Sequence, residues 1–360
     1  MIMKGIIITH KGIEDISKKE IKELINSNAI VKDTICIFPI KKIEDLCTLC
    51  YSGQSFIKVL YYIDSLEVDK NFKENLKKKI KKNIKIFEKF IKKKQKFKVK
   101  CVKIDSDIIT SEIEDIAGSV VNYKVDLEAP DLILYIYIYK TNCYIGLDFS
   151  GFDLSKREYK IFNFPFSLKG NIAYSLIRLS GYTKKEKILD PFCSSGEIII
   201  EAALFASNMP SYYYKKNEFL FNKYLKFDFN KIDKDINIKN NIYALDSQFR
   251  NVRAAEKNAK IAGINKIINF SRTEIEWLDT KFKKNEIDMI VTNIRFSKYQ
   301  NIEKLVKEFF HQCKYILSKK GLILIVTNNK ELLENSEFKL KEQREIWQGK
   351  EKLEVLIYAM

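Results

Sequence analysis

Hydrophobic and polar positions follow different patterns in the two parts of the chain. From about residue 166 onward, short apolar runs alternate with segments of helical periodicity, an order that predicts a doubly wound α/β sheet. The predicted helices include 197–208, 249–263 and 302–317. The predicted strands are 186–190, 241–246, 266–270, 287–293 and 321–327, followed by two C-terminal strands at 344–347 and 351–359.

The first 150 residues predict an α+β arrangement instead. Alternating or apolar strands are expected at 5–9, 34–40, 54–63, 96–104, 130–140 and 143–151. A helix is expected over 14–25, and another over 110–124 with Thr110 or Ser111 as its N-cap. We therefore divide the chain into a first half at 1–150, a linker at 151–165 and a second half at 166–360. A Tyr-, Phe- and Lys-rich insertion occupies 209–240.

Residues 70–94 carry an apolar stripe at helical spacing, with lysines on the remaining faces. The stripe predicts one helix, and the lysines give it a cationic surface. Residues 70–100 hold 15 Lys and 2 Glu, a net charge of +13, whereas the whole chain carries +17. Such a concentration points to a polyanion, most simply nucleic acid, or else to a solvated lysine-rich face. The candidate RNA contacts are Lys77, Lys81, Lys85 and Lys92.

Several classes of protein are disfavoured by composition. No apolar run approaches the roughly 18 residues of a membrane span, and the N-terminus lacks the features of a signal peptide, so we expect a cytoplasmic protein. The chain has an odd number of cysteines, which disfavours a disulfide framework. Cys47 and Cys50 fit the apolar face of an amphipathic helix, and we expect no metal site. Two histidines, His10 and His311, leave little for a Ser-His-Asp site.

Polar residues close three of the predicted strands. The segment ILDPFCSSGE at 188–197 passes from a strand through a turn of small residues into a helix. Asp246 ends the second strand, and Asn293 ends the fourth. In open α/β sheets ligands bind beyond the carboxyl ends of the strands, and an acidic residue after the second strand accepts hydrogen bonds from ribose hydroxyls. The pattern predicts a nucleoside site at the first two strands and a reacting group beside the fourth.

These motifs resemble a known family. DPFCSSGEIIIEAAL is similar to the DPFCGSGT-IEAA motif of THUMP-domain RNA methyltransferases, which use S-adenosylmethionine (SAM) to methylate guanine N2 in tRNA or rRNA. The resemblance covers essentially the whole chain. FKVKCVKI, TSEIEDIAGSVV and APDLILYIYI resemble the THUMP RNA-binding module, and ALDSQFRNVRAAEKNAKIAGI resembles the segment after the second strand. It implies a Rossmann-like SAM domain after a THUMP-containing, ferredoxin-like first half.

The resemblance also implies roles for individual residues. The methionine end of SAM would be held by Asp190, Cys193, Ser195 and Gly196. Asp246 would hold the ribose and Glu274 the adenine amino group. Asn293 and Phe296 fall on the family motif N-[PL]-P-[YF], whose Asn accepts from the guanine amine and whose ring stacks on the flipped base.

The chain departs from the family pattern inside these motifs. Ser194 replaces a glycine, Glu197 a threonine, and Glu158 the glycine of the linker. Most directly, N-[PL]-P-[YF] reads Asn293-Ile294-Arg295-Phe296, and we count Arg295 among the candidate catalytic residues.

The function expected from the sequence is methylation of guanine N2 in tRNA, in the acceptor-stem region. The alternatives are a catalytically degenerate paralogue that binds RNA or regulates, and an rRNA guanine-N2 methyltransferase. The sequence leaves the target nucleotide and the oligomeric state open.

Overall fold

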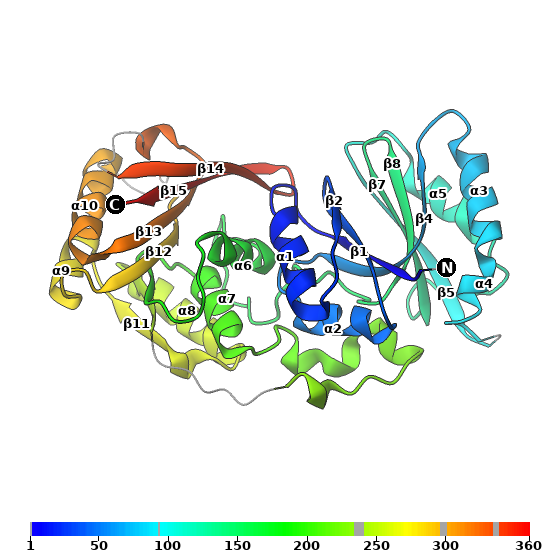
Figure 1. Cartoon of the computed structure of the whole chain (residues 1–360), viewed down its shortest axis with the longest axis horizontal. Coiled ribbons are helices and arrows are strands. Elements are labelled where there is room, and N and C mark those ends of the chain that lie inside the picture. Colours follow the sequence, from blue (N-terminus) through cyan, green and yellow to red (C-terminus); the bar gives the residue numbers. More distant parts are fainter. Residues whose placement is uncertain (1, 93, 234–240, 296–300, 334–337) are drawn as a thin grey trace. The chain divides into compact units, whose positions relative to one another are not determined.

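The computed structural model describes residues 2–92, 94–233, 241–295, 301–333 and 338–360. They form two compact units (Figure 1). Unit 1 comprises Met1–Thr9, Ser17–Leu154 and Tyr212–Ile232, and unit 2 comprises His10–Ile16, Ser155–Ser211 and Asp233–Met360.

Unit 1 is built on one mixed eight-stranded sheet in the order β2-β3-β1-β4-β8-β7-β5-β6. Its strands are β1 (Lys4–Ile8), β2 (Ile30–Lys32), β3 (Ile35–Pro39), β4 (Lys58–Glu67), β5 (Lys96–Ile104), β6 (Lys124–Val125), β7 (Leu132–Tyr139) and β8 (Asn142–Asp148). Its helices are α1 (Glu14–Ile25, whose first turn belongs to unit 2), α2 (Glu44–Ser52), α3 (Phe72–Lys82), α4 (Ile84–Phe87) and α5 (Thr110–Gly118). The central strands β7 and β8 are almost wholly buried, as their continuous apolar runs predict.

The single helix predicted over 70–94 is wrong, because the structure breaks it into α3 and α4 at Asn83. The Asn83 amide donates to the carbonyl of Lys79 and to the Asp64 carboxylate, which stabilises a non-helical turn. The apolar stripe is buried as expected at Phe72, Leu76, Ile80, Phe87 and Ile91.

The predicted cap of the helix over 110–124 is also wrong. The helix begins at Thr110, its N-cap is Ile109, and no side chain caps it. Glu114, three residues beyond Ser111, accepts a hydrogen bond from the backbone N–H of Cys101 on β5 and so does not cap the helix.

Unit 2 is the doubly wound half. Its seven-stranded sheet has the order β11-β10-β9-β12-β13-β15-β14. Strands β9 to β13 are parallel, and β15 pairs antiparallel with both β13 and β14. The strands are β9 (Ile188–Asp190), β10 (Ile242–Asp246), β11 (Ile268–Arg272), β12 (Ile287–Asn293), β13 (Leu317–Thr327), β14 (Lys339–Gln348) and β15 (Glu351–Ala359). The strand order reverses at β9, the position where such sheets bind ligands.

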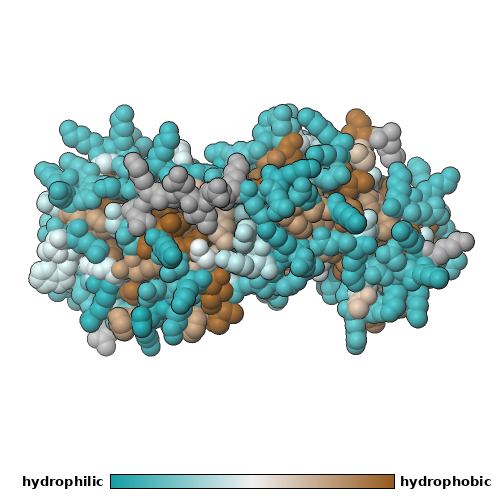
Figure 2. All heavy atoms as spheres, turned by 90° about the horizontal axis from the view of Figure 1, so that it is seen from below, coloured by the Kyte–Doolittle hydropathy of each residue, from teal (hydrophilic) through white to brown (hydrophobic). Residues whose placement is uncertain are grey.

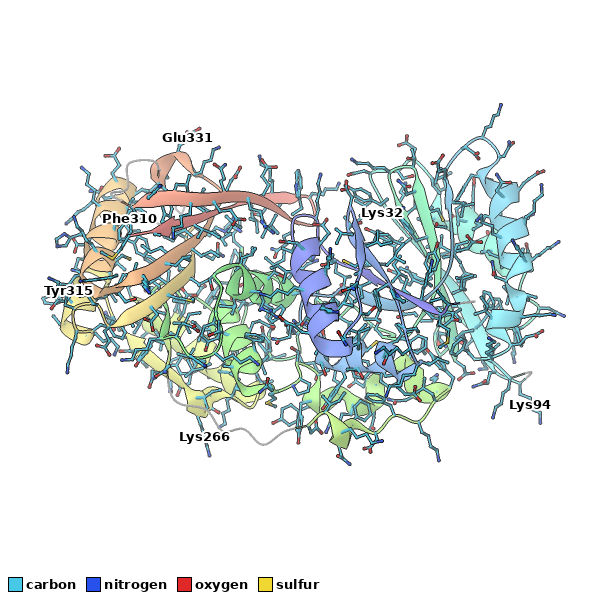
Figure 3. All side chains as sticks on the ribbon, in the orientation of Figure 1. Lys32, Lys94, Lys266, Phe310, Tyr315 and Glu331 are labelled. Carbon is cyan, nitrogen blue, oxygen red and sulfur yellow. The ribbon has the colours of Figure 1, made fainter. Side chains whose placement is uncertain are left out.

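Helices cover both faces of this sheet: α6 (Gly170–Leu179), α7 (Glu197–Ser207), α8 (Phe249–Ile261), α9 (Leu278–Lys281) and α10 (Ile302–Ile316). Helix α7 is buried nearly all round, whereas α10 is amphipathic: its Phe310 is buried and its Tyr315 is exposed (Figure 3). The predicted strands and helices of this half are confirmed within a few residues.

The insertion at 209–240 interrupts the second half in sequence, but most of it packs with the first half. Its described part from Tyr212 to Ile232 contains short 3₁₀ turns and belongs to unit 1. Backbone N–H groups of Leu220 and Phe221 bond to the carbonyls of Ser150 and Phe149, just after β8. Most of the aromatic residues of the insertion therefore pack in the core of unit 1, whereas Tyr213 and Tyr214 are exposed.

Hydrophilic residues cover most of the face shown in Figure 2. Among the described residues, no helix is both long and apolar enough to cross a membrane.

Candidate functional site

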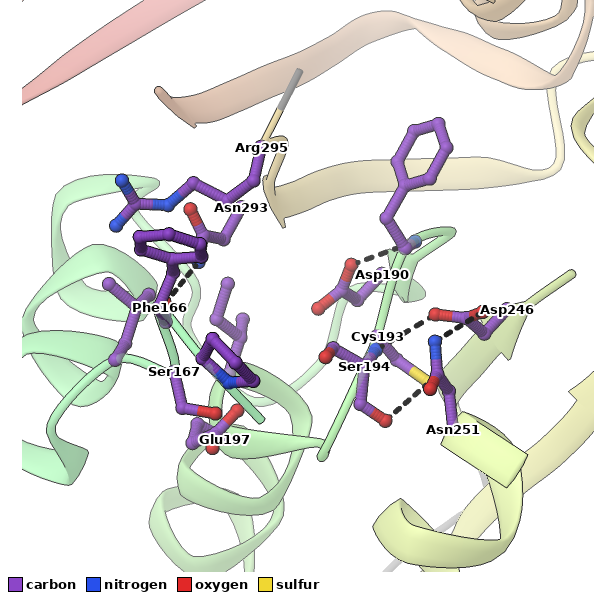
Figure 4. A pocket seen from close by; sticks show the side chains of 14 residues that line it. Phe166, Ser167, Asp190, Cys193, Ser194, Glu197, Asp246, Asn251, Asn293 and Arg295 are labelled. Carbon is purple, nitrogen blue, oxygen red and sulfur yellow. Dashed lines mark hydrogen bonds between the residues drawn. The ribbon is translucent and has the colours of Figure 1, made fainter. Parts of the chain in front are cut away.

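A pocket of unit 2 lies at the carboxyl ends of β9, β10 and β12 (Figure 4). Its cavity measures about 50 Å³. The wall is formed by Pro165, Phe166, Ser167, Leu168, Asp190, Phe192, Cys193, Ser194, Glu197, Ile198, Asp246, Asn251, Asn293 and Arg295.

Asp190, the last residue of β9, is buried in this wall. Its Oδ1 accepts hydrogen bonds from the Thr292 hydroxyl at 2.7 Å and from the Phe192 backbone N–H at 3.1 Å. Burial raises the pKa of Asp190 to about 7, although the two hydrogen bonds lower it. The nearby carboxylates of Asp246 and Glu197 raise this pKa further. A cationic ligand would reverse this shift and hold the carboxylate ionised.

Asp246, the last residue of β10, organises the loop after β9. Its Oδ2 accepts from the Ser194 N–H at 3.0 Å, and its Oδ1 accepts from the Gln248 N–H and the Asn251 amide, both at 2.9 Å. Ser194 has φ +49°, a left-handed conformation that suits the glycine it replaces.

Ser195 and Gly196, two predicted cofactor residues, lie behind the pocket wall rather than in it. The Ser195 hydroxyl bonds to Glu197 and to Ser167, which joins the loop after β9 to the linker. Gly196 has φ +86°, and a Cβ there would lie 2.9 Å from the Cβ of Ala255 on α8. Gly196 is therefore required for the turn and for the close approach of α7 to α8.

Asn293 and Arg295 form the opposite side of the pocket with Phe166 (Figure 4). The Asn293 amide nitrogen donates to the Phe166 carbonyl at 3.4 Å, whereas its Oδ1 is buried and has no partner among the described residues. Arg295 donates from Nη1 to Glu351 at 2.8 Å, and its guanidinium lies 5.4 Å from the centre of the Phe166 ring.

One side of the pocket is acidic. Asp190, Asp246 and Glu197 all line it, with the Lys160 ammonium 3.6 Å from Glu197. Burial lowers the pKa of Lys160 and raises that of the Cys193 thiol well above its ordinary value, so Cys193 is a neutral wall residue. No cluster of three or more His, Cys, Asp or Glu side chains suited to a metal occurs in the part of the chain that the structure describes.

The remaining predicted residues lie elsewhere. Glu274 is about half exposed, near Arg272 and Trp277 beyond the end of β11, and is not part of the pocket wall. Phe296 lies outside the described residues. The four candidate RNA-contacting lysines, Lys77, Lys81, Lys85 and Lys92, are all exposed on or after α3 and α4 of unit 1.

Sequence reasoning missed the contribution of the segment 165–168, where the linker meets the second half of the chain. Phe166 and Ser167 enter the pocket because residues 165–168 fold back against β12 and the loop after β9, a non-local contact without a local pattern. Phe166 has φ +68° with half its surface exposed, a strained conformation of the kind that gathers at functional sites.

Comparison with known proteins identifies the fold and its chemistry. Residues 157–354 match the family model described as the RMKL-like methyltransferase domain, which is more than half of the chain. The chain belongs to this family. Residues 70–148 match the THUMP domain, which contains the lysine-rich α3 and α4. The sequence-based predictions of the family, of the fold class and of a methyltransferase enzyme are thus confirmed.

Named relatives share most of the chain. A tRNA (guanine(6)-N2)-methyltransferase of Methanocaldococcus jannaschii is 31% identical over 72% of this chain and 74% of its own length. Its counterpart from Archaeoglobus fulgidus is 26% identical over 69% of this chain and 64% of its own length. A solved structure described as a possible methylase from Clostridium difficile 630 superposes with a TM-score of 0.82 over 99% of this chain and 98% of its own, at 20% identity, and shares the fold.

Proposed function

We propose that this RMKL-like methyltransferase transfers the methyl group of SAM to N2 of a guanine in the acceptor stem of tRNA. The observation that carries the proposal is the buried Oδ1 of Asn293, which has no partner among the described residues and lies in the same pocket as Asp190 and Asp246. The relatives named as tRNA guanine-N2 methyltransferases support the choice of tRNA and of guanine.

The acidic side of the pocket fits the methyl donor. SAM carries a sulfonium, an ammonium and a ribose with two hydroxyls. Asp190 and Glu197 offer carboxylates to the cationic end, and Asp246 lines the pocket at the end of the second strand of the parallel sheet, where an acidic residue binds ribose hydroxyls. SAM supplies an activated methyl group, so the protein's task is to orient donor and acceptor and to exclude water. Glu274, outside the pocket wall, is assigned to the adenine amino group on the resemblance alone.

The other side fits the acceptor amine. An unpaired buried acceptor costs about 1–3 kcal/mol, and an N–H of the incoming amine would remove that penalty at Asn293. The Asn293 amide nitrogen is held by the Phe166 carbonyl, which turns the oxygen toward the amine. A hydrogen bond accepted there stabilises the positive charge that develops on nitrogen during transfer.

The substrate has to deliver its base into this pocket. A guanine inside a stem must leave the helix first, and an aromatic side chain compensates part of the lost stacking. Phe296 holds this role by resemblance. Unit 1 offers the exposed lysines of its THUMP domain to RNA phosphates, an interaction that is independent of sequence.

The test is direct methylation. The full-length protein is incubated with tritiated SAM and an unmodified tRNA transcript of its own source, and the labelled nucleoside is identified by mass spectrometry. The proposal predicts N2-methylguanosine. Replacing the stem guanine at position 6, the position named for the two relatives, by adenine is the matched control, which should lose the label. Failure to label any tRNA, or labelling of a different base, would overturn the proposal.

A further inference from the structure

Arg295 carries two buried nitrogens that nothing in the described part of the protein satisfies. Its side chain is 4% exposed. Nε and Nη2 have no hydrogen-bond partner within the described ranges, whereas Nη1 donates to Glu351. Nε and Nη2 form one edge of the planar guanidinium, so their N–H groups point in parallel and suit two neighbouring acceptors. Buried donors of this kind are costly unless a ligand pairs them.

The orientation of this edge is fixed by two contacts. Glu351 holds the opposite corner of the guanidinium at 2.8 Å, and the Phe166 ring packs against its face. The guanidinium of Arg295 lines the same pocket as Asn293 (Figure 4). Asn293 and Arg295 are two residues apart, the spacing that places side chains on one side of an extended chain.

We propose that Arg295 recognises the target base itself, by donating from Nε and Nη2 to O6 and N7 of guanine. This inference rests on the proposed function and deepens it. Arginine paired with O6 and N7 is the commonest specific protein contact to guanine, and these acceptors lie on the opposite side of the base from the N2 amine. Asn293 would then bind the reacting amine while Arg295 binds the far edge, and adenine, which has a donor in place of O6, is excluded.

Charge and burial favour a base over a phosphate or a carboxylate. The Arg295 cation is already paired with Glu351, which weakens its attraction for a second anion and leaves its remaining N–H groups for neutral acceptors. The side chain is also almost fully buried, at a depth that an inserted base reaches more readily than the RNA backbone does.

The test compares guanine with 2-aminopurine at the target position of the tRNA. 2-Aminopurine keeps the N2 amine and N7 but lacks O6. Arg295→Met keeps the length of the side chain and removes its N–H groups. The matched control is Arg344→Met, which removes another ion-paired arginine of unit 2 that is not in the pocket. Thermal unfolding of each variant checks the fold, and calorimetry measures its affinity for SAM.

Wild-type and Arg344→Met proteins should methylate the guanine substrate about tenfold or more faster than the 2-aminopurine substrate, measured as kcat/KM. Arg295→Met should slow on guanine by a similar factor and lose most of that preference, with SAM affinity unchanged. 2-Aminopurine also lacks N1–H, so part of the preference for guanine can come from other contacts. The decisive quantity is therefore how far Arg295→Met reduces the ratio of kcat/KM for guanine to kcat/KM for 2-aminopurine.

An undiminished preference in Arg295→Met would overturn the inference while leaving the proposed function intact. If Arg295→Met instead binds SAM at least tenfold more weakly, Nε and Nη2 of Arg295 bind the carboxylate of SAM and not the base, which also overturns the inference. If its tRNA affinity depends less steeply on salt, by about one contact, the edge holds a phosphate. A wild-type protein that methylates no guanine would refute the proposed function itself.

Discussion

Asp190 should make the stability of unit 2 depend on pH in a direction opposite to that of most carboxylates. Its pKa is raised from 3.8 to about 7, chiefly by burial at the end of β9. The folded state therefore binds a proton that the unfolded state releases between these two values. Over that window ionisation is more costly in the folded state, so the free energy of unfolding falls as pH rises. At about 1.4 kcal/mol per pH unit the loss is roughly 4 kcal/mol by pH 7.

Asp190→Asn removes the titrating group and keeps an oxygen that can accept from Thr292 and from the Phe192 N–H. Urea unfolding of both proteins between pH 4 and pH 8 isolates the effect as a difference. Tryptophan fluorescence reports unit 2, because both tryptophans of the chain, Trp277 and Trp347, belong to it. The free energy of unfolding of the variant, minus that of the wild type, should rise by roughly 4 kcal/mol across this range.

A difference that stays constant within about 1 kcal/mol from pH 4 to pH 8 would refute this account of Asp190. Asp279→Asn is the matched control, because it removes an exposed carboxylate of the same unit. If that control gave the same pH-dependent difference, the effect would come from general charge and not from burial at the pocket.

Two further predictions concern ligand binding. Asp246→Ala removes the acceptor of hydrogen bonds from Ser194, Gln248 and Asn251, and should weaken SAM binding at least tenfold in a calorimetric titration; unchanged affinity would make Asp246 a loop residue only. Replacing four exposed lysines by glutamine should weaken tRNA binding and reduce its salt dependence by up to one unit per lost phosphate contact, as measured by filter binding at several salt concentrations; an unaltered slope would show that RNA binds elsewhere. The four are Lys77, Lys81, Lys85 and Lys92.

The parts of the fold that sequence alone predicts are those set by local periodicity. The central strands of unit 2, such as β9, β12 and β13, are largely buried apolar runs, and its helices carry apolar stripes. Their order and type therefore follow from the sequence. The break at Asn83 does not follow, because it depends on Asp64 of another element. Nor does the position of the segment from Tyr212 to Ile232, which packs with unit 1 through contacts far apart in sequence.

The same distinction applies to the site. Asp190, Asp246 and Asn293 were expected to share one edge because carboxyl ends of parallel strands meet there, and the structure brings all three into one pocket. The role of Phe166 could not be predicted, because it requires the segment 165–168 to fold back onto β12. The ion pair that fixes Arg295 likewise depends on Glu351, 56 residues further along the chain.

The measurement that tests the central claim most directly is single-turnover methyl transfer by Asn293→Ala. The variant should lose transfer to tRNA by at least a hundredfold while its affinities for SAM and tRNA stay within about threefold of wild type, because a lost hydrogen bond to a developing charge acts mainly on the rate. Asn329→Ala, at an exposed residue just beyond β13 on the same edge of the sheet, should transfer at the wild-type rate. Transfer that survives in Asn293→Ala at the wild-type rate would contradict the assignment of this pocket as the methylation site.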